Sequence, residues 1–468
     1  MSRQAVQLLS LTEAVDQLIR QLETSALETT KTAGAGHPLV ACSVRVAPFD
    51  ILTWLEMQEA SLKFYWQTRD RRYETAGLGA TVILDQENCS IPGDLTKCIQ
   101  DLPTSEEADQ ALFGGLRFDP RFPSDKNSKG WTKFGNGLFF LPRIRLTRSG
   151  KDYTLSCSAH RDELASSNIN ETSTHLRNLS FVDKASDASE PGEFTREDSP
   201  DKAGWKLIVD KALRSFENDP LKKVVLARET TLEFRHDLNP WHILRRLKEQ
   251  SDSCYIFGFQ PSDDIAFIGA SPERLYYRKS GDIASEAIAG TRPRSLDETE
   301  DRALAEELMH SDKDRREHDL VSRTIADDLN DLCTEIDVEQ RASILKQSRV
   351  QHLATNITGH LREQVTDGDL LTHLHPTPAV GGYPRDIATE LIRELEGFDR
   401  GWYAGPIGWL SSSESEFAVG IRSGLVRGRT LTLYSGAGIV AGSTPEKEWE
   451  EIEQKMSGFL EAVTGRNR

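Results

Sequence analysis

The sequence predicts an α+β protein in which most strands pair antiparallel, or a sandwich of such sheets. Strand patterns joined by short turns outnumber strand–helix–strand units, which argues against a Rossmann sheet. Alternating runs also flank two turn dipeptides, Ser149-Gly150 and Ser280-Gly281, as β-hairpins require. At 468 residues, the chain is long enough for one large unit or for two to three ordinary domains.

The first half begins with an amphipathic helical pattern in residues 1–25. Residues 44–55 and 80–85 are expected to be strands, and residues 137–159 form the first hairpin. Residues 184–204 are polar and rich in serine, proline and acids, so we expect an exposed connection there.

The second half has more strand patterns. Residues 222–234 alternate with period two, residues 254–260 and 265–271 are short apolar strands, and residues 271–294 form the second hairpin. Residues 298–333 then carry one long helical pattern, which completes the α+β prediction.

Composition limits the classes of function. The chain is 37% hydrophobic and 28% charged, and no apolar run approaches the roughly 18 residues of a membrane span. The N-terminus lacks a signal peptide's apolar stretch, and six scattered cysteines predict reduced thiols, so we expect a soluble cytoplasmic protein. The formal charge of −17 argues against nucleic acid as a partner, and an anionic ligand would need local cations or a metal.

Residues 434–455, YSGAGIVAGSTPEKEWEEIEQK, have the order strand, glycine turn and helix that a dinucleotide site uses. The helix, however, carries five glutamates, which would repel a pyrophosphate. Glu448, Glu451 and Lys455 share one helical face, so a divalent cation bridging carboxylates to an anionic substrate fits better. A solvated acidic face is the alternative from this stretch alone.

A second acidic pair supports the cation. Asp314 and Glu317 stand at i and i+3 in KDRREHDL, next to His318. Two helices that present carboxylates to each other would form the sparse, water-rich site that Mg²⁺ accepts.

Nine segments together resemble a known family. They are KVVLAR, FIGASPERL, AIAGTRPR, SDKDRREHDLV, VQHLAT, LHPTPAVGGYPRDIA, GWYAGPIGW, FAVGIRS and SGAGIVAGSTPEKEWEEIEQK. Their order is similar to that in the chorismate-utilising enzymes, which are the anthranilate, aminodeoxychorismate, isochorismate and salicylate synthases. The resemblance is dense over residues 205–465, and FYWQTRDRRYETAGLGA looks like the start of isochorismate synthases of the menaquinone and phylloquinone type.

The resemblance implies an anthranilate synthase component I-like fold, with packed antiparallel sheets, helices outside and the site between the sheets. Residues 1–195 would then be the N-terminal part of the fold and residues 196–468 the chorismate-binding region, packed as one compact unit. It also implies a monomer without an amidotransferase subunit.

The resemblance further implies a set of site residues. Glu317 and Glu451 would bind Mg²⁺, supported by Asp314 and Glu448, and the metal would hold the ring carboxylate of chorismate. Arg422 and Lys455 would neutralise the enolpyruvyl carboxylate and its surroundings. The remaining substrate-binding positions are Gly290, Thr291, His352, Ala379, Tyr403, Gly436 and Gly438.

The implied reaction moves a hydroxyl from C4 of the ring to C2 and therefore needs a base and an acid. Lys223 matches the family's base, which requires a neutral amine, and Glu273 matches the acid, which requires a raised pKa. His352 would orient the ring carboxylate, although a buried structural histidine is nearly as good an interpretation. Taken singly, Lys223 and Glu273 read as an ordinary lysine before a strand and a turn glutamate.

Several positions favour isochorismate synthase within the family. Lys223 stands where ammonia-using anthranilate synthases have glutamine, and Ala289 where aminodeoxychorismate synthases have lysine. Ala379 and Val380 stand where salicylate and anthranilate synthases have threonine, so pyruvate elimination is not expected. Salicylate synthase and, less well, anthranilate synthase component I remain alternatives, as do a chorismate-binding pseudoenzyme and a nucleotide-dependent oxidoreductase.

Overall fold

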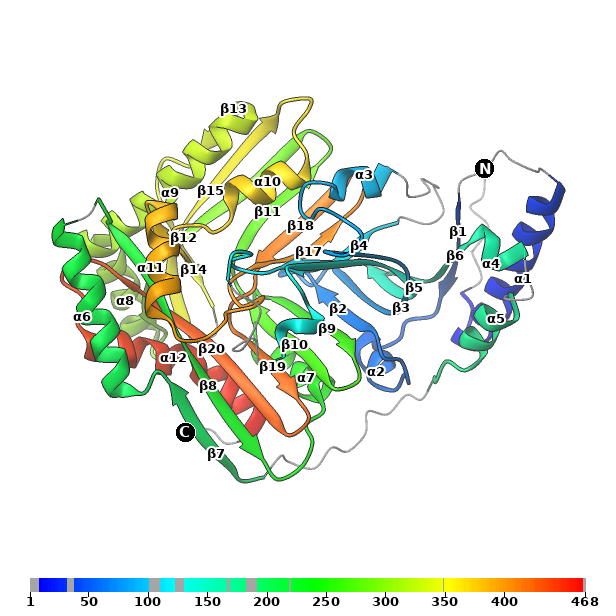
Figure 1. Ribbon diagram of the computed structural model, residues 1–468, viewed down its shortest axis with the longest axis horizontal. Helices are drawn as coiled ribbons and strands as arrows, with labels where there is room; N and C mark the ends of the chain where they lie inside the picture. The colour runs from blue at the N-terminus through cyan, green and yellow to red at the C-terminus, as the bar shows by residue number, and fades with distance from the viewer. Residues whose placement is uncertain are drawn as a thin grey trace.

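The computed structural model of the chain describes residues 8–31, 38–100, 110–122, 130–165, 169–181, 192–218, 220–347 and 349–465. In this part of the chain, twenty strands join one hydrogen-bonded sheet, and all pairings between named strands are antiparallel. Helices lie around the outside of this sheet (Figure 1). The predicted α+β class with antiparallel pairing is therefore confirmed.

The bounds of the elements follow in chain order. The strands of the first part are β1 (Leu39–Val46), β2 (Lys63–Gln67), β3 (Tyr73–Asp85), β4 (Leu112–Leu116), β5 (Gly137–Ser149), β6 (Asp152–His160) and β7 (Phe194–Ser199). Its helices are α1 (Leu11–Lys31), α2 (Ile51–Glu56), α3 (Leu95–Gln100), the 3₁₀ turn η1 (Trp131–Lys133), α4 (Arg161–Ala165) and α5 (Ile169–Arg177).

The second part continues in the same manner. Its strands are β8 (Lys223–Phe234), β9 (Tyr255–Ser262), β10 (Ile265–Ser271), β11 (Arg274–Lys279), β12 (Asp282–Pro293), β13 (Cys333–Val338), β14 (Ser343–Lys346), β15 (Val350–Leu361), β16 (Gly382–Tyr383), β17 (Pro406–Leu410), β18 (Glu414–Val419), β19 (Ser423–Arg427) and β20 (Thr430–Ile439). Its helices are α6 (Lys202–Asn218), α7 (Pro240–Gln250), α8 (Glu298–His310), α9 (Asp312–Leu332), α10 (Asp367–Leu374), α11 (Arg385–Leu395) and α12 (Pro445–Thr464).

The sheet divides into two arms that share β5. One arm runs from β5 through β3, β2, β9, β10, β19 and β20 to β8 and β7. The other runs through β4, β17, β18, β11 and β12 to β15. Strands from both sides of residue 195 thus pair within each arm, although the division into 1–195 and 196–468 stays a prediction.

An aromatic core fills the space where the arms approach. Phe64 of β2 stacks on Phe113 of β4 with ring centroids 4.2 Å apart, and it also packs on Phe259 of β9. Trp402, fully buried, contacts Phe259 and Phe134 edge-on. Each such ring pair contributes about 0.5–1.5 kcal/mol beyond simple burial, so these contacts hold the two arms together.

Two helices that matter for the site begin with well-defined caps. Ser311 accepts a hydrogen bond from the Asp314 amide and starts α9, which buries Val321, Ile325 and Leu329 at helical spacing. Pro445 occupies the first turn of α12, and Gly465, with φ +67°, ends it.

Three expectations about secondary structure were wrong. The predicted helix over 298–333 is two helices, because the Ser311 cap begins a new one. The predicted strand 44–55 ends at Val46, and its last residues belong to α2 (Ile51–Glu56), which Asp50 caps by accepting a hydrogen bond from the Thr53 amide. Part of the predicted connection 184–204 is β7, which pairs with β8, and residues 182–191 lie outside the described residues.

The described helices contain none with the length and apolar character that crossing a membrane requires.

Candidate functional site

A cavity of about 320 Å³ opens where β8 and β20 of one arm face β12 and β15 of the other, with α9 and α12 beside it. It is lined by all fifteen residues that the sequence singled out: Lys223, Glu273, Gly290, Thr291, Asp314, Glu317, His352, Ala379, Tyr403, Arg422, Gly436, Gly438, Glu448, Glu451 and Lys455. The fold therefore brings these residues together, while their individual roles remain predictions.

Lys223, the first residue of β8, is buried and forms an ion pair with Glu317 of α9. The distance between Lys223 Nζ and Glu317 Oε1 is 2.8 Å. Gly438 of β20 leaves room for this pair, because a Cβ there would lie 3.0 Å from Lys223 Cε and 3.3 Å from Glu317 Oε1. The contact joins the predicted base to a predicted metal ligand, so both groups are held by each other in this structure.

Glu273 lies in the turn between β10 and β11, and only 6% of its surface is exposed. Burial, assisted by the negative charge of Glu286, raises the pKa of Glu273 to about 8, against the opposing effect of Lys223 and Lys455. A carboxyl group with this pKa is protonated at neutral pH. That is the state that the predicted proton donor requires.

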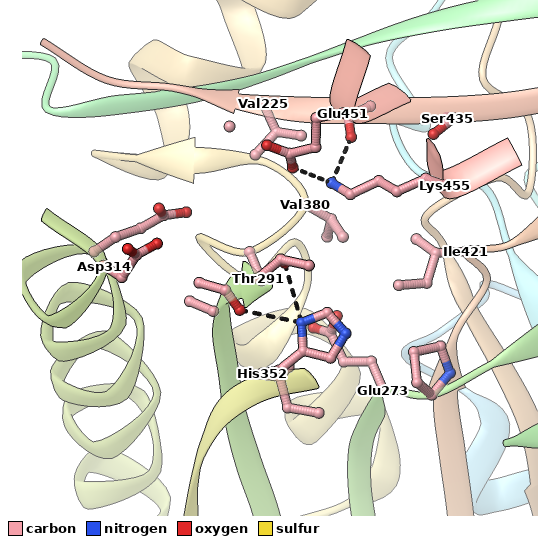
Figure 2. Close-up of a pocket in the computed structure, with 18 of the residues that line it drawn as sticks. Val225, Glu273, Thr291, Asp314, His352, Val380, Ile421, Ser435, Glu451 and Lys455 are labelled. Atoms are coloured by element: carbon pink, nitrogen blue, oxygen red, sulfur yellow. Dashed lines mark hydrogen bonds and ion pairs between the residues drawn. The ribbon is translucent and has the colours of Figure 1, made fainter. Parts of the chain in front are cut away.

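His352 of β15 presents a hydrogen-bond acceptor to the cavity. Its Nδ1 lies 3.1 Å from the Gly290 carbonyl oxygen and 3.1 Å from Thr291 Oγ1 (Figure 2). Because a carbonyl oxygen can only accept, Nδ1 carries the proton, and the buried Nε2, which has no partner among the described residues, is left unprotonated. Burial lowers the pKa of His352 to about 3, so the ring is neutral.

This tautomer bears on the predicted role of His352. A neutral imidazole with a bare Nε2 cannot donate to a carboxylate, but it can accept from a hydroxyl group or a water molecule. Gly290 makes the arrangement possible, since its φ of +72° forms a bulge in β12 that turns the carbonyl toward His352.

The carboxylates of the cavity stand in pairs on two helices. Asp314 and Glu317 belong to α9, and Glu448 and Glu451 to α12. Figure 2 shows Asp314 and Glu451 on different sides of the cavity. No three His, Cys, Asp or Glu side chains within the described ranges are grouped to enclose a metal. Paired carboxylates that leave room for water and for a substrate oxygen suit Mg²⁺, which rarely occupies an all-protein cage.

The α12 pair is electrostatically strained. Burial and the charge of Glu451 raise the pKa of Glu448. For Glu451, burial acts in the same direction, but the positive charges of Lys455, Lys313 and Lys223 together lower the pKa. The Lys455 Nζ lies 2.7 Å from Glu451 Oε1 and 2.9 Å from the Gly436 carbonyl oxygen. A cation between the helices would relieve the repulsion between the two glutamates.

Arg422 is the candidate anchor for a substrate carboxylate. It lies between β18 and β19 in a left-handed conformation, with φ +51°. The described residues provide no hydrogen bond or ion pair to its guanidinium group, whereas Lys223, Lys455 and Arg292 are each paired with a carboxylate. A half-buried arginine that has no partner among the described residues is suited to binding an anion.

An apolar wall completes the cavity. Ala379, Val380, Ile421 and the buried Tyr403 line this part of the cavity, and Figure 2 labels Val380 and Ile421. Ala379 and Val380 are the two positions of this wall where the sequence led us to expect apolar side chains.

Comparisons with known proteins agree with this geometry. The model of a family described as chorismate binding enzyme matches residues 24–464. The chain belongs to this chorismate binding enzyme family.

Several relatives of this chorismate binding enzyme are similar over much or nearly all of its length. Isochorismate synthase MenF of Escherichia coli is 34% identical over 96% of this chain and 98% of its own. Isochorismate synthase MenF of Bacillus subtilis is 36% identical over 76% of this chain and 75% of its own length. The salicylate biosynthesis isochorismate synthase of Pseudomonas aeruginosa is 32% identical over 91% of this chain and 90% of its own length.

The solved structure of MenF, the menaquinone-specific isochorismate synthase from Escherichia coli, has the same fold as this chorismate binding enzyme. The TM-score is 0.83 at 31% identity, covering 97% of this chain and 99% of that one. This similarity confirms the predicted fold.

Two cationic wall residues of the chorismate binding enzyme did not emerge from the sequence. Arg292 of β12 pairs with Asp314 at 2.9 Å, so Asp314 is already engaged. Lys313 stands one helical turn before Glu317 and contributes positive charge near Glu448 and Glu451. Both residues lie inside segments that resemble the family, and their position in these segments could have identified them as cavity residues.

Proposed function

We propose that the chain is an isochorismate synthase, which converts chorismate into isochorismate by adding water at C2 and releasing the C4 hydroxyl group. One observation carries this assignment: Lys223 and a protonated Glu273 line the same cavity. The names of its full-length relatives support it.

Substrate binding depends on the cations of the cavity. Chorismate carries two carboxylates, and a chain of net charge −17 needs local positive charge to bind it. Arg422, which has no carboxylate partner in the described residues, takes the enolpyruvyl carboxylate, and Lys455 adds positive charge nearby. The hydroxyl group of Thr291 accepts from His352 Nδ1, so its own proton is free to be donated toward the ligand.

Catalysis requires two proton transfers. Lys223, acting as a free amine, removes a proton from the water that attacks C2, and its nitrogen must leave the contact with Glu317 to reach that water. Glu273 donates its proton to the departing C4 oxygen, which leaves as water. Each transfer by a positioned side chain accelerates the reaction about 10²–10⁴-fold. His352 Nε2 accepts a hydrogen bond from a hydroxyl group in the cavity, so it orients that oxygen without taking up a proton.

The reaction as proposed uses Mg²⁺, held by Glu317 and Glu451 with Glu448 and Asp314 in support. When bound, the ion supplies positive charge that offsets the ring carboxylate and orients it. The paired carboxylates of α9 and α12 are the donors expected for it.

The apolar wall at Ala379 and Val380 favours a reaction that stops at isochorismate. We place the product in menaquinone or phylloquinone biosynthesis, in the cytoplasm, with the enzyme acting as a monomer.

Chromatography of the products formed from chorismate and Mg²⁺, with and without ammonium, tests the proposal. We expect isochorismate in both reactions. Salicylate with pyruvate would indicate a salicylate synthase, and anthranilate in the ammonium reaction would indicate an anthranilate synthase, so either main product contradicts the assignment.

A further inference from the structure

Arg228 is a completely buried arginine that does not line the cavity. It lies in β8, five residues after Lys223, and its side chain is 0% exposed. Arg228 Nη2 lies 2.5 Å from Glu453 Oε1, and its guanidinium carbon lies 3.8 Å from the centre of the Trp449 ring. Its Nη2 also contacts Met456 Sδ at 3.9 Å. All three contacts are with α12.

The stability of the fold does not account for this arginine. Arg228 Nε and Nη1 have no hydrogen-bond partner among the described residues, although Asp198 Oδ1 lies 3.7 Å from Nε. Burying a charge with incomplete hydrogen bonding is costly, and replacing a buried ion pair with apolar groups is often neutral or stabilising. A specific positioning role is a better explanation of such a residue.

The contacts of Arg228 fall on one stripe of α12. Trp449, Glu453 and Met456 have spacings of four and three residues, so they share one face of the helix. Glu448, Glu451 and Lys455 have spacings of three and four, and they form a second stripe that lines the cavity. Because the helix is rigid, fixing the rotation of the first stripe fixes the direction of the second.

Trp449 also contacts a second aromatic residue, Trp205. Its ring lies 6.5 Å, edge-on, from the ring of Trp205 in α6. The Trp205 Nε1 donates to the Pro445 carbonyl oxygen at 3.1 Å, which holds the first turn of α12. The Trp449 ring therefore has the guanidinium group of Arg228 and the ring of Trp205 as its two described cationic and aromatic contacts.

We propose that Arg228 is a positioning residue that sets the rotation of α12, so that Glu448, Glu451 and Lys455 face the cavity. This role rests on the proposed function, because it matters only if these groups bind Mg²⁺ and substrate. Since Lys223 and Arg228 belong to the same strand, β8 both carries the proposed base and orients the helix that carries a proposed metal ligand.

The chain offers a matched control. Arg196 of β7 contacts the same Glu453 Oε1 at 2.5 Å and Asp198 Oδ1 at 3.0 Å, but its side chain is 26% exposed, and the guanidinium group over the Trp449 ring is that of Arg228. Arg196→Met removes an ion pair from the same carboxylate without removing the stacked guanidinium group.

The experiment compares the native chain, Arg228→Met and Arg196→Met by calorimetric titration with Mg²⁺ in the presence of isochorismate, and by turnover at saturating Mg²⁺. Loss of a residue that orients a metal ligand typically weakens metal binding about 10–100-fold, and we expect a change of that size in Arg228→Met. We expect turnover to recover largely at high Mg²⁺. Arg196→Met should keep the native Mg²⁺ affinity within about twofold, as exposed ion pairs contribute little.

Trp449→Leu provides a second variant if Arg228→Met does not fold, and the same loss of Mg²⁺ affinity is expected. Native Mg²⁺ affinity in a folded Arg228→Met or Trp449→Leu protein would overturn the positioning role while leaving the proposed function intact. If the native protein itself binds no Mg²⁺, the metal site of the proposed function fails, and this role for Arg228 fails with it.

Discussion

Lys223 Nζ and Glu317 Oε1 lie 2.8 Å apart, although 94 residues separate them in the chain. The lysine begins β8, the glutamate lies in α9, and Gly438 of β20 leaves the space between them open. The proposed base is thus paired with a proposed metal ligand. This contact links the proposed proton transfer to the proposed metal binding. A side chain that intrudes on the pair would therefore disturb both.

Adding one methyl group at Gly438 should therefore impair catalysis. In Gly438→Ala, the new Cβ would lie 3.0 Å from Lys223 Cε and force the pair to shift by a few tenths of an ångström. We expect kcat to fall by about tenfold, equivalent to about 1.4 kcal/mol in the barrier. Gly397→Ala is the control, because a Cβ there meets nothing within 4 Å. Equal kcat values in both variants would show that the pair tolerates displacement.

Removing the amine of Lys223 should abolish turnover while chorismate still binds. For Lys223→Ala, we expect kcat to fall about 10²–10⁴-fold, the contribution of a general base. Chorismate affinity, measured by tryptophan fluorescence, should change little because Arg422 and Lys455 remain. The exposed neighbour Lys222 provides the control Lys222→Ala. Turnover that survives in Lys223→Ala would remove Lys223 from the role of base.

The pKa of Glu273 predicts a loss of activity at alkaline pH. Its value of about 8 means that the carboxyl group carries its proton below pH 8 and loses it as the pH rises through 8. If Glu273 is the proton donor, kcat/KM should fall above that pH. Glu273→Gln should lose activity about 10²–10⁴-fold. A native profile that stays flat from pH 7 to pH 9.5 would contradict this assignment.

The same pKa shift affects stability. The folded protein holds the Glu273 proton more tightly than the unfolded chain, in which the pKa is about 4.3, so this group's contribution to stability decreases between pH 4.3 and pH 8. Glu273→Gln removes the ionisable group, so the variant should gain stability relative to the native protein as the pH rises to 9. Denaturant unfolding at pH 6 and pH 9 measures the difference in unfolding free energy between the two proteins. If this difference is the same at both pH values, the pKa of Glu273 is not raised by burial.

His352 should remain in one neutral tautomer across the working pH range. The pKa of about 3 and the Nδ1–H contact with Gly290 predict an unprotonated Nε2 from pH 5 to pH 9. The ¹⁵N spectrum of histidine-labelled protein, assigned with His352→Gln, tests this, and binding of isochorismate should shift the Nε2 resonance as it accepts a hydrogen bond. A protonated Nε2 would instead restore the predicted contact with a carboxylate.

Removing the charge of Glu451 should raise the requirement for Mg²⁺. For Glu451→Gln, we expect the Mg²⁺ concentration for half-maximal activity to rise about 10–100-fold or more, since a proposed ligand is lost. Glu450→Gln changes the adjacent, exposed glutamate and should leave the Mg²⁺ concentration for half-maximal activity unchanged. Native activity that persists in excess EDTA would refute the metal assignment.

The sequence predicted the fold class and the composition of the cavity because both depend on local patterns. Glycines such as Gly290, acidic pairs on helical faces, and the nine family-like segments are visible in the chain itself. The break at Ser311 and the helix after Asp50 were missed, because a single capping side chain overrides the periodicity around it.

Other features could not be predicted because they depend on contacts between distant segments. The strand character of β7 comes from its pairing with β8, although its sequence is highly charged. The pairing of Lys223 with Glu317, the tautomer of His352 and the burial of Arg228 likewise arise only in the folded chain.

A crystal structure with Mg²⁺ and isochorismate would show the metal ligands and the proton-transfer groups together. We predict that Glu317 and Glu451 both coordinate the metal, and that Lys223 and Glu273 lie on opposite faces of the ring, near C2 and C4 respectively. A metal bound by neither glutamate, or a ring that places both C2 and C4 beyond reach of Lys223 and Glu273, would contradict this prediction.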